Sequence, residues 1–138
     1  MDMDAVALKN FDPRAGIILV TATLYGRVEL KVQLVFDTGA TYCMLPVAVV
    51  KKLGIPISKK RTTQTTTASK VETSPLVDIP VIEVLGQRVE NVTALVRDLP
   101  PLAGVDGLLG LSFLKHFKVM IDFEEGELSL DGFMPELR

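Results

Sequence analysis

The alternation of residues 28–36 constrains the fold of this chain more than any other feature of its sequence. Apolar side chains stand at every second position: Val28, Leu30, Val32, Leu34 and Phe36. Because successive side chains of a β-strand point to opposite faces, this pattern predicts a strand with one face on a core and the other in water. The stretch 17–24, rich in β-branched residues, predicts a second strand, antiparallel to the first through a turn at Gly26.

The remainder of the chain predicts more strands and one or two short helices. Pro46 suits the first turn of a helix over Val47–Leu53, and Gly54 suits its C-terminal cap. Ser112 is expected to cap a second short helix over Phe113–Phe117. Four further segments have strand-like composition around Gly-containing turns: Leu76–Leu85, Val89–Val96, Val119–Phe123 and Glu127–Leu130. We therefore expect an all-β fold class with one or two short helices.

Two segments leave alternatives open. Residues 1–15 have no clear period, so they are treated as an N-terminal arm that is either flexible or an edge strand, ahead of a single domain over 16–138. Residues 58–74 are polar and rich in Thr. They fit a disordered loop, and they also fit an exposed hairpin, because Thr favours strands without needing a core.

The composition argues against several classes of partner and cofactor. Lys and Arg number 15 against 17 Asp and Glu, a balance that does not favour nucleic acid or an anionic membrane as a partner. No apolar run approaches the ~20 residues needed to span a bilayer. A single Cys excludes an internal disulfide, and one His with one Cys excludes a typical His/Cys zinc site within one chain. The acidic start Met1-Asp2-Met3-Asp4 is unlike a signal peptide, so we expect a cytoplasmic protein. We expect no metal and no cofactor, although carboxylates remain an alternative set of metal ligands.

The alternating strand runs directly into the motif Asp-Thr-Gly-Ala at positions 37–40. Gly39 permits a tight bend and a close approach, and Ala40 leaves room beside the turn. Asp, Thr and Gly are also ordinary turn residues, so the tetrapeptide alone fits a plain turn. A second motif, Leu108-Leu109-Gly110, follows well downstream.

Together these two motifs resemble a known family. The segment Val35-Phe36-Asp37-Thr38-Gly39-Ala40 resembles the signature of aspartic proteases, specifically the retropepsin-like family, and Leu108-Leu109-Gly110 is similar to that family's second element. The resemblance covers roughly residues 16–131. It implies a closed or partly open β-barrel of the retropepsin type, in which residues 58–74 contain the hairpin, or flap, that covers the substrate cleft.

The resemblance also implies an activity and its residues. An aspartic endopeptidase hydrolyses peptide bonds with a water activated between two carboxylates, which share one proton because like charges at close range do not both ionise easily. The implied catalytic residues are Asp37, Thr38 and Gly39. The implied substrate contacts are Ala40 and, at the flap tip, Thr67, Ala68 and Ser69. Because the sequence has one Asp-Thr-Gly, the second carboxylate must come from a second copy, and we expect a homodimer that acts on a peptide or protein.

Two departures from the family pattern accompany this expectation. Thr41 stands where retroviral members usually place an acid, which is closer to cellular and bacterial relatives, and no Gly occurs between Gly54 and Gly86, where many relatives have one at the flap tip. An alternative from another class is a catalytically silent dimerisation or peptide-binding module on the same fold. A third is an unrelated β-barrel in which the motif occurs by chance.

Overall fold

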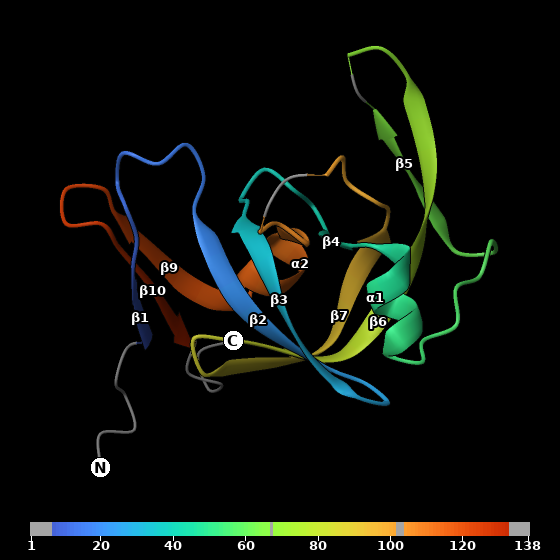
Figure 1. The fold of residues 1–138 in the computed structure, drawn as a ribbon, viewed down its shortest axis with the longest axis horizontal. Helices are drawn as coiled ribbons and strands as arrows, with labels where there is room; N and C mark the ends of the chain where they lie inside the picture. The colour runs from blue at the N-terminus through green and yellow to red at the C-terminus, as the bar shows by residue number, and fades with distance from the viewer. Residues whose placement is uncertain (1–6, 67, 102–103, 133–138) are drawn as a thin grey trace.

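The computed structural model describes residues 7–66, 68–101 and 104–132. Strands predominate in this part of the chain, and two short helices interrupt them (Figure 1). In chain order the elements are β1 (Ala7–Asn10), β2 (Leu19–Tyr25), β3 (Glu29–Phe36), β4 (Cys43–Leu45), α1 (Val47–Lys52), β5 (Thr62–Thr66), β6 (Val71–Val84), β7 (Gln87–Val96), β8 (Gly107–Leu109), α2 (Leu111–Leu114), β9 (Phe117–Asp122) and β10 (Glu127–Gly132).

Six of the strands close into a barrel. Their order is β2-β3-β8-β4-β7-β6, and β6 pairs again with β2. The predicted β2–β3 hairpin is present, with Val20 opposite Leu34 and Ala22 opposite Val32. Val32 and Leu34 are buried in the core, as the alternation predicts, and so are their partners Val20 and Ala22. Val28, at the start of the alternating segment, lies before β3 and is exposed. The all-β prediction with one or two short helices is confirmed, since the described residues form two, and the barrel is closed.

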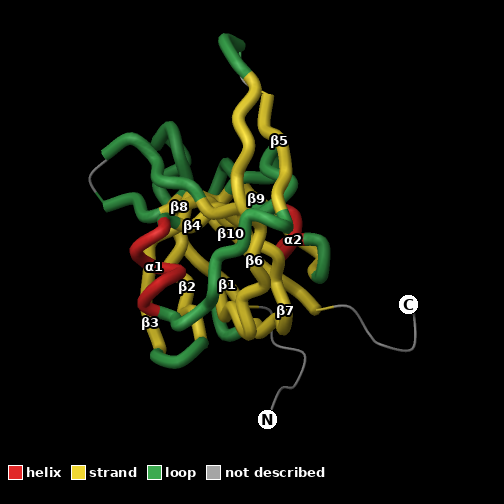
Figure 2. Tube along the Cα trace, turned by 90° about the vertical axis from the view of Figure 1, so that its right-hand side faces the viewer, coloured by secondary structure: helices red, strands yellow, loops and turns green. Residues whose placement is uncertain are grey.

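The Thr-rich segment forms a hairpin that stands off the barrel (Figures 1 and 2). β5 pairs with the outer part of β6, from Thr62 opposite Pro75 to Thr66 opposite Val71. The inner part of β6 pairs with β7 and β2 within the barrel. We call residues 62–66 and 68–75 the flap. The interpretation of this segment as a disordered loop is therefore wrong for the two paired strands.

The segment 7–10, within the predicted arm, is an edge strand. β1 pairs antiparallel with β10, and β10 with β9, in a three-stranded sheet beside the barrel. The two helices lie close to the expected positions, with Pro46 and Gly110 at the N-caps of α1 and α2 and Gly54 in the left-handed region at φ 76°. Among the described residues, neither helix is long and apolar enough to cross a membrane.

Candidate active site

Asp37 lies where β3 leaves the barrel, and its backbone is fixed by a parallel neighbour. β3 pairs with β8 from Leu34 opposite Gly107 to Phe36 opposite Leu109. The pairing continues one residue further, because the Asp37 N–H donates a 3.0 Å hydrogen bond to the Leu109 carbonyl. The two motifs found in the sequence therefore meet in space, and the second one holds the first.

The turn after Asp37 presents the carboxylate rather than burying it. The Gly39 N–H donates to Asp37 Oδ1 at 2.8 Å, and the Ala40 N–H donates to the Asp37 carbonyl at 3.3 Å. Asp37 is half-buried in the single chain, whereas Thr38 and Gly39 are exposed. Among the described residues, no salt bridge engages the Asp37 carboxylate. It is oriented by a backbone N–H and open to a partner on its exposed side.

Helix α2 clamps the far end of this loop. The Leu111 N–H donates to the Ala40 carbonyl at 2.8 Å, and the Ser112 N–H donates to the Thr41 carbonyl at 3.0 Å. These are N–H groups of the first helical turn, which have no partner within a helix. The approach requires glycine at position 110, because a Cβ there would overlap the Tyr42 carbonyl and lie 2.7 Å from the Ala40 carbonyl oxygen.

The prediction that the Ser112 side chain caps α2 is wrong. Ser112 lies inside the helix, whose N-cap is Gly110. Its buried hydroxyl donates to the Thr93 carbonyl at 2.7 Å and accepts from the Cys43 N–H at 2.9 Å. It therefore links α2 to β4 and β7, a long-range role that no local pattern reveals. Burial raises the pKa of the neighbouring Cys43 thiol, which keeps it protonated at neutral pH.

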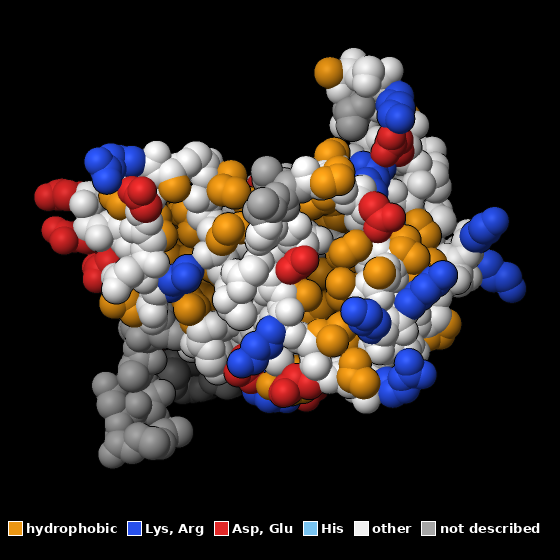
Figure 3. Space-filling model, in the orientation of Figure 1, with side chains coloured by type: hydrophobic (Ala, Val, Ile, Leu, Met, Phe, Trp, Pro, Cys, Tyr) orange, Lys and Arg blue, Asp and Glu red, His pale blue; other side chains and the backbone are white. Residues whose placement is uncertain are grey.

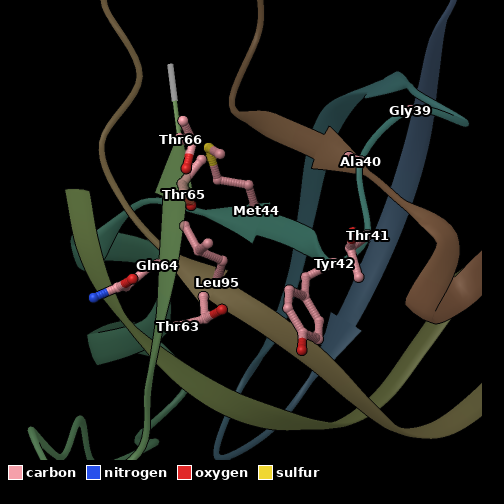
Figure 4. Close-up of a pocket in the computed structure, with 10 residues that line it drawn as sticks. All are labelled: Gly39, Ala40, Thr41, Tyr42, Met44, Thr63, Gln64, Thr65, Thr66 and Leu95. Carbon is pink, nitrogen blue, oxygen red and sulfur yellow. The ribbon is translucent and has the colours of Figure 1, made fainter. Parts of the chain in front are cut away.

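A groove of about 400 Å³ lies between the Asp37 loop and the flap (Figure 4). Residues 39–42 form one wall and residues 63–66 of β5 form the other, with Met44 and Leu95 between them. Figure 3 shows hydrophobic side chains gathered at the foot of the flap. Among the residues that the structure describes, no charged side chain lines the groove. Its shape and lining suit an extended, mainly uncharged peptide segment.

The structure places the predicted site residues in two groups. Asp37, Thr38, Gly39 and Ala40 are consecutive in the loop, and the last two line the groove. Ala68 and Ser69 are exposed in the bend between β5 and β6, outside the groove lining, and Thr67 lies outside the described residues. Sequence reasoning missed most of the lining: Thr41, Tyr42, Met44, Thr63, Gln64, Thr65, Thr66 and Leu95. A signal existed only in β5, where a strand alternates its faces and Thr63 and Thr65 are the half-buried positions.

Another acid close to the motif has a structural role. Asp106 precedes β8, and its Oδ2 accepts a 2.8 Å hydrogen bond from the Gln33 N–H. Its own N–H donates to the Gln33 carbonyl, also at 2.8 Å. This reciprocal pair extends the β3–β8 ladder at the end away from Asp37. The Asp106 carboxylate is thus used in holding β3.

Comparison with known proteins agrees with this geometry. The family model described as aspartyl protease matches residues 20–113, well over half of the chain and a span that includes both motifs. A search of curated proteins gives no match. Among solved structures, the chain is similar to a retropepsin-like aspartic protease from Rickettsia conorii, with 25% identity and a TM-score of 0.65 over 91% of this chain and 98% of that one. The predicted retropepsin-type barrel is confirmed, and this chain belongs to the aspartyl protease family.

Proposed function

We propose that this chain is an aspartic endopeptidase that acts as a homodimer, with one Asp37 from each copy. The observation that carries the proposal is the position of Asp37. Its half-buried carboxylate lies in a loop clamped by the second motif, and the same loop forms one wall of a groove bordered by the flap. Membership of the aspartyl protease family supports the same reaction class.

The need for two copies follows from the chemistry. Peptide hydrolysis without a metal or covalent intermediate requires a base for the attacking water and an acid for the carbonyl oxygen. Two adjacent carboxylates that share one proton supply both, and they titrate as a coupled unit. The sequence contains one Asp-Thr-Gly, and the Asp106 carboxylate is bonded to Gln33. A twofold axis beside the exposed Thr38 and Gly39 provides the second carboxylate.

The reaction then uses residues that the fold has already placed. The ionised Asp37 takes a proton from the water between the two carboxylates as the water attacks the peptide carbon. The protonated partner donates to the carbonyl oxygen, and a tetrahedral gem-diol forms. The gem-diol collapses to two peptides when the proton passes to the leaving nitrogen. Gly39 allows substrate backbone to approach the dyad, and the flap strand β5 offers an edge along which an extended peptide can lie.

The substitution Asp37→Asn tests the function. We expect cleavage of a peptide library between acidic and neutral pH to fall by at least about 10²–10⁴-fold, because the amide is not a base. A statine-type inhibitor should abolish the wild-type activity. Circular dichroism should be unchanged, because an amide oxygen still accepts the Gly39 N–H. Ultracentrifugation at the assay concentration measures the dimer.

Three outcomes separate the alternatives. Cleavage that survives in Asp37→Asn would contradict the assigned mechanism. A wild-type dimer that binds peptides from the library without cleaving them under any condition would favour the silent peptide-binding module. A protein that remains monomeric while cleaving with full activity would contradict the shared dyad.

A further inference from the structure

The flap is joined to the barrel by an ion pair in addition to its backbone. Glu72, on the outer part of β6, places Oε2 2.6 Å from Nη2 of Arg97, which follows β7. Its other oxygen, Oε1, is 2.7 Å from Nζ of Lys70, which directly precedes the same strand. The side chain of Arg97 is 20% exposed and that of Glu72 is 31% exposed, so the pair is partly shielded from water. Partial burial makes such a pair less sensitive to salt than an exposed one.

The barrel side of this contact is held in place. The Arg97 N–H donates to the Leu45 carbonyl at 3.0 Å, directly after Met44, which lines the groove. The adjacent Asp98 accepts the Val47 N–H through Oδ1 at 3.0 Å, at the start of α1. Since β4 is a barrel strand and α1 follows it directly, a loss of the ion pair should move the flap rather than Arg97.

The flap side of the contact borders the groove. Glu72 is directly opposite Thr65 in the β5–β6 ladder, and Thr65 lines the groove. Residues directly opposite each other in a ladder move together, so the position of Glu72 sets the position of Thr65. Thr65 and Met44 both line the groove (Figure 4).

We propose that Glu72 and Arg97 form an anchor that fixes the height of the flap over the groove and thereby positions Thr65 against a bound peptide. Both are positioning residues, because they act through Thr65. The consequence for peptide binding rests on the proposed function, whereas the anchoring of the flap does not.

The charges around Glu72 determine the pH range in which the Glu72–Arg97 ion pair persists. The hydrogen bond from Lys70, with the charge of Arg97, holds the pKa of Glu72 below its ordinary value, against the opposing effect of partial burial. A carboxylate with a lowered pKa contributes fully above its unfolded-state pKa, and the contribution is lost as the pH falls through the folded-state value. The anchor therefore persists at neutral and mildly acidic pH and is released in stronger acid.

Spin labels on the flap and on α1 measure the anchor directly. Ser69→Cys and Ala48→Cys are exposed sites, and the native Cys43 is buried, so the labels enter only where intended. Double electron–electron resonance is recorded with labelled chains diluted into unlabelled ones, which isolates distances within one chain. We expect a narrow distribution of label-to-label distances at pH 7 when Glu72 and Arg97 are both present. The Glu72→Gln substitution should broaden or displace this distribution at pH 7. In the protein that keeps Glu72, the same broadening should appear when the pH falls through the Glu72 pKa.

A matched control lies on the same strand. Glu83 pairs with Arg88 at 3.1 Å near the opposite end of β6, with a similarly exposed carboxylate. Glu83→Gln should leave the distance distribution and its narrow width unchanged at pH 7. A Glu72→Gln distribution that matches the unsubstituted anchor at pH 7 would overturn the proposal.

Kinetics on a cleaved peptide then connects the anchor to function. We expect Glu72→Gln and Arg97→Gln each to raise KM several-fold with kcat nearly unchanged, and the double variant to be no worse than either single one. Unchanged KM in Glu72→Gln would remove the positioning role. If no variant, including the wild type, cleaves peptide while the distances still respond to Glu72, the proposed function fails and the anchor stands.

Discussion

The Asp37 loop and the flap face each other across one groove, but they are held by different interactions. The loop at 37–42 is fixed by backbone hydrogen bonds to Leu109, Leu111 and Ser112 and by the close approach of Gly110. The flap is fixed to the barrel by its own two strands and by the Glu72–Arg97 ion pair. Backbone contacts at close range leave the Asp37 loop little freedom, whereas a hairpin held by a side-chain pair moves more easily.

Burial shows the same contrast. Leu109, whose carbonyl accepts the Asp37 N–H, and Phe113 of the adjoining helix α2 are fully buried, so the loop is joined to elements of the core. Within the described part of the flap, Ser74 is the buried residue, and the other side chains are exposed or half-buried. Moving the flap therefore costs little hydrophobic burial. The Asp37 loop is therefore joined to buried core elements, whereas the flap is mostly exposed.

The substitution Gly110→Ala disrupts the contact between the Asp37 loop and α2 and has the largest expected effect on stability. The new Cβ overlaps carbonyl oxygens of the loop, so the loop or α2 must shift. We expect the free energy of unfolding to fall by about 1–3 kcal/mol, as in other overpacked sites, with peptide cleavage largely lost. Urea denaturation measures the first quantity and a peptidase assay the second.

Gly16→Ala is the control for Gly110→Ala. A Cβ at Gly16 would meet nothing within 4 Å, and the backbone there is not in the left-handed region. Its stability should stay within about 0.5 kcal/mol of the wild type. If Gly110→Ala is as stable and active as Gly16→Ala, the loop is less rigid than its contacts indicate.

Much of the Asp37 loop and its supporting strands could be predicted from sequence, whereas little of the flap and the groove lining could. The alternation at 28–36 and the motif at Asp37 are local patterns, so β3, its partner β2 and the loop can be predicted from the sequence. Met44 and Leu95 reach the groove only because β4 and β7 pair in parallel, a contact between distant segments. The sequence of the flap fits both a disordered loop and a hairpin, because the stability of the hairpin depends on strand pairing rather than on a buried face.

The substitution Thr65→Lys tests whether the flap contributes to peptide binding in the groove. Thr65 is half-buried and lines the groove, where the described lining residues carry no charge, so an ammonium group there opposes the binding of an uncharged peptide. We expect kcat/KM to fall about tenfold, equal to ~1.4 kcal/mol, while the free energy of unfolding changes by less than about 0.5 kcal/mol.

The exposed Thr62, outside the groove lining on the same strand, provides the matched control. Thr62→Lys should cleave peptide at the wild-type rate. Equal losses of kcat/KM in the two Lys variants would show that the added charge acts through the general field of the flap rather than inside the groove.

Replacing Asp78 by Asn tests the base of the flap, with a smaller effect that depends on pH. Asp78 accepts hydrogen bonds from Arg61 at 2.8 and 3.1 Å and from Thr93 at 3.0 Å, and the Arg61 bonds hold the pKa of Asp78 below its ordinary value. The stabilisation is present above the unfolded-state pKa of Asp and is lost as the pH falls through the lowered folded-state pKa. Thermal unfolding should therefore show Asp78→Asn slightly less stable than the wild type at neutral pH and equally stable in strong acid. A difference that stays constant across this range would assign the effect to packing.

The reactivity of two thiols compares the loop and the flap within one molecule. Cys43 follows the Asp37 loop, is fully buried, accepts the Gly110 N–H through Sγ at 3.4 Å, and has a pKa raised by burial. Because the thiolate is the reactive form, Cys43 should react with a disulfide reagent several orders of magnitude more slowly than an exposed thiol. In Ser69→Cys we expect one equivalent to react at once and the second only when urea unfolds the barrel. Rapid reaction of Cys43 in native buffer would mean that the loop and α2 separate readily, and the proposed division between a rigid catalytic side and an adaptable flap would not hold.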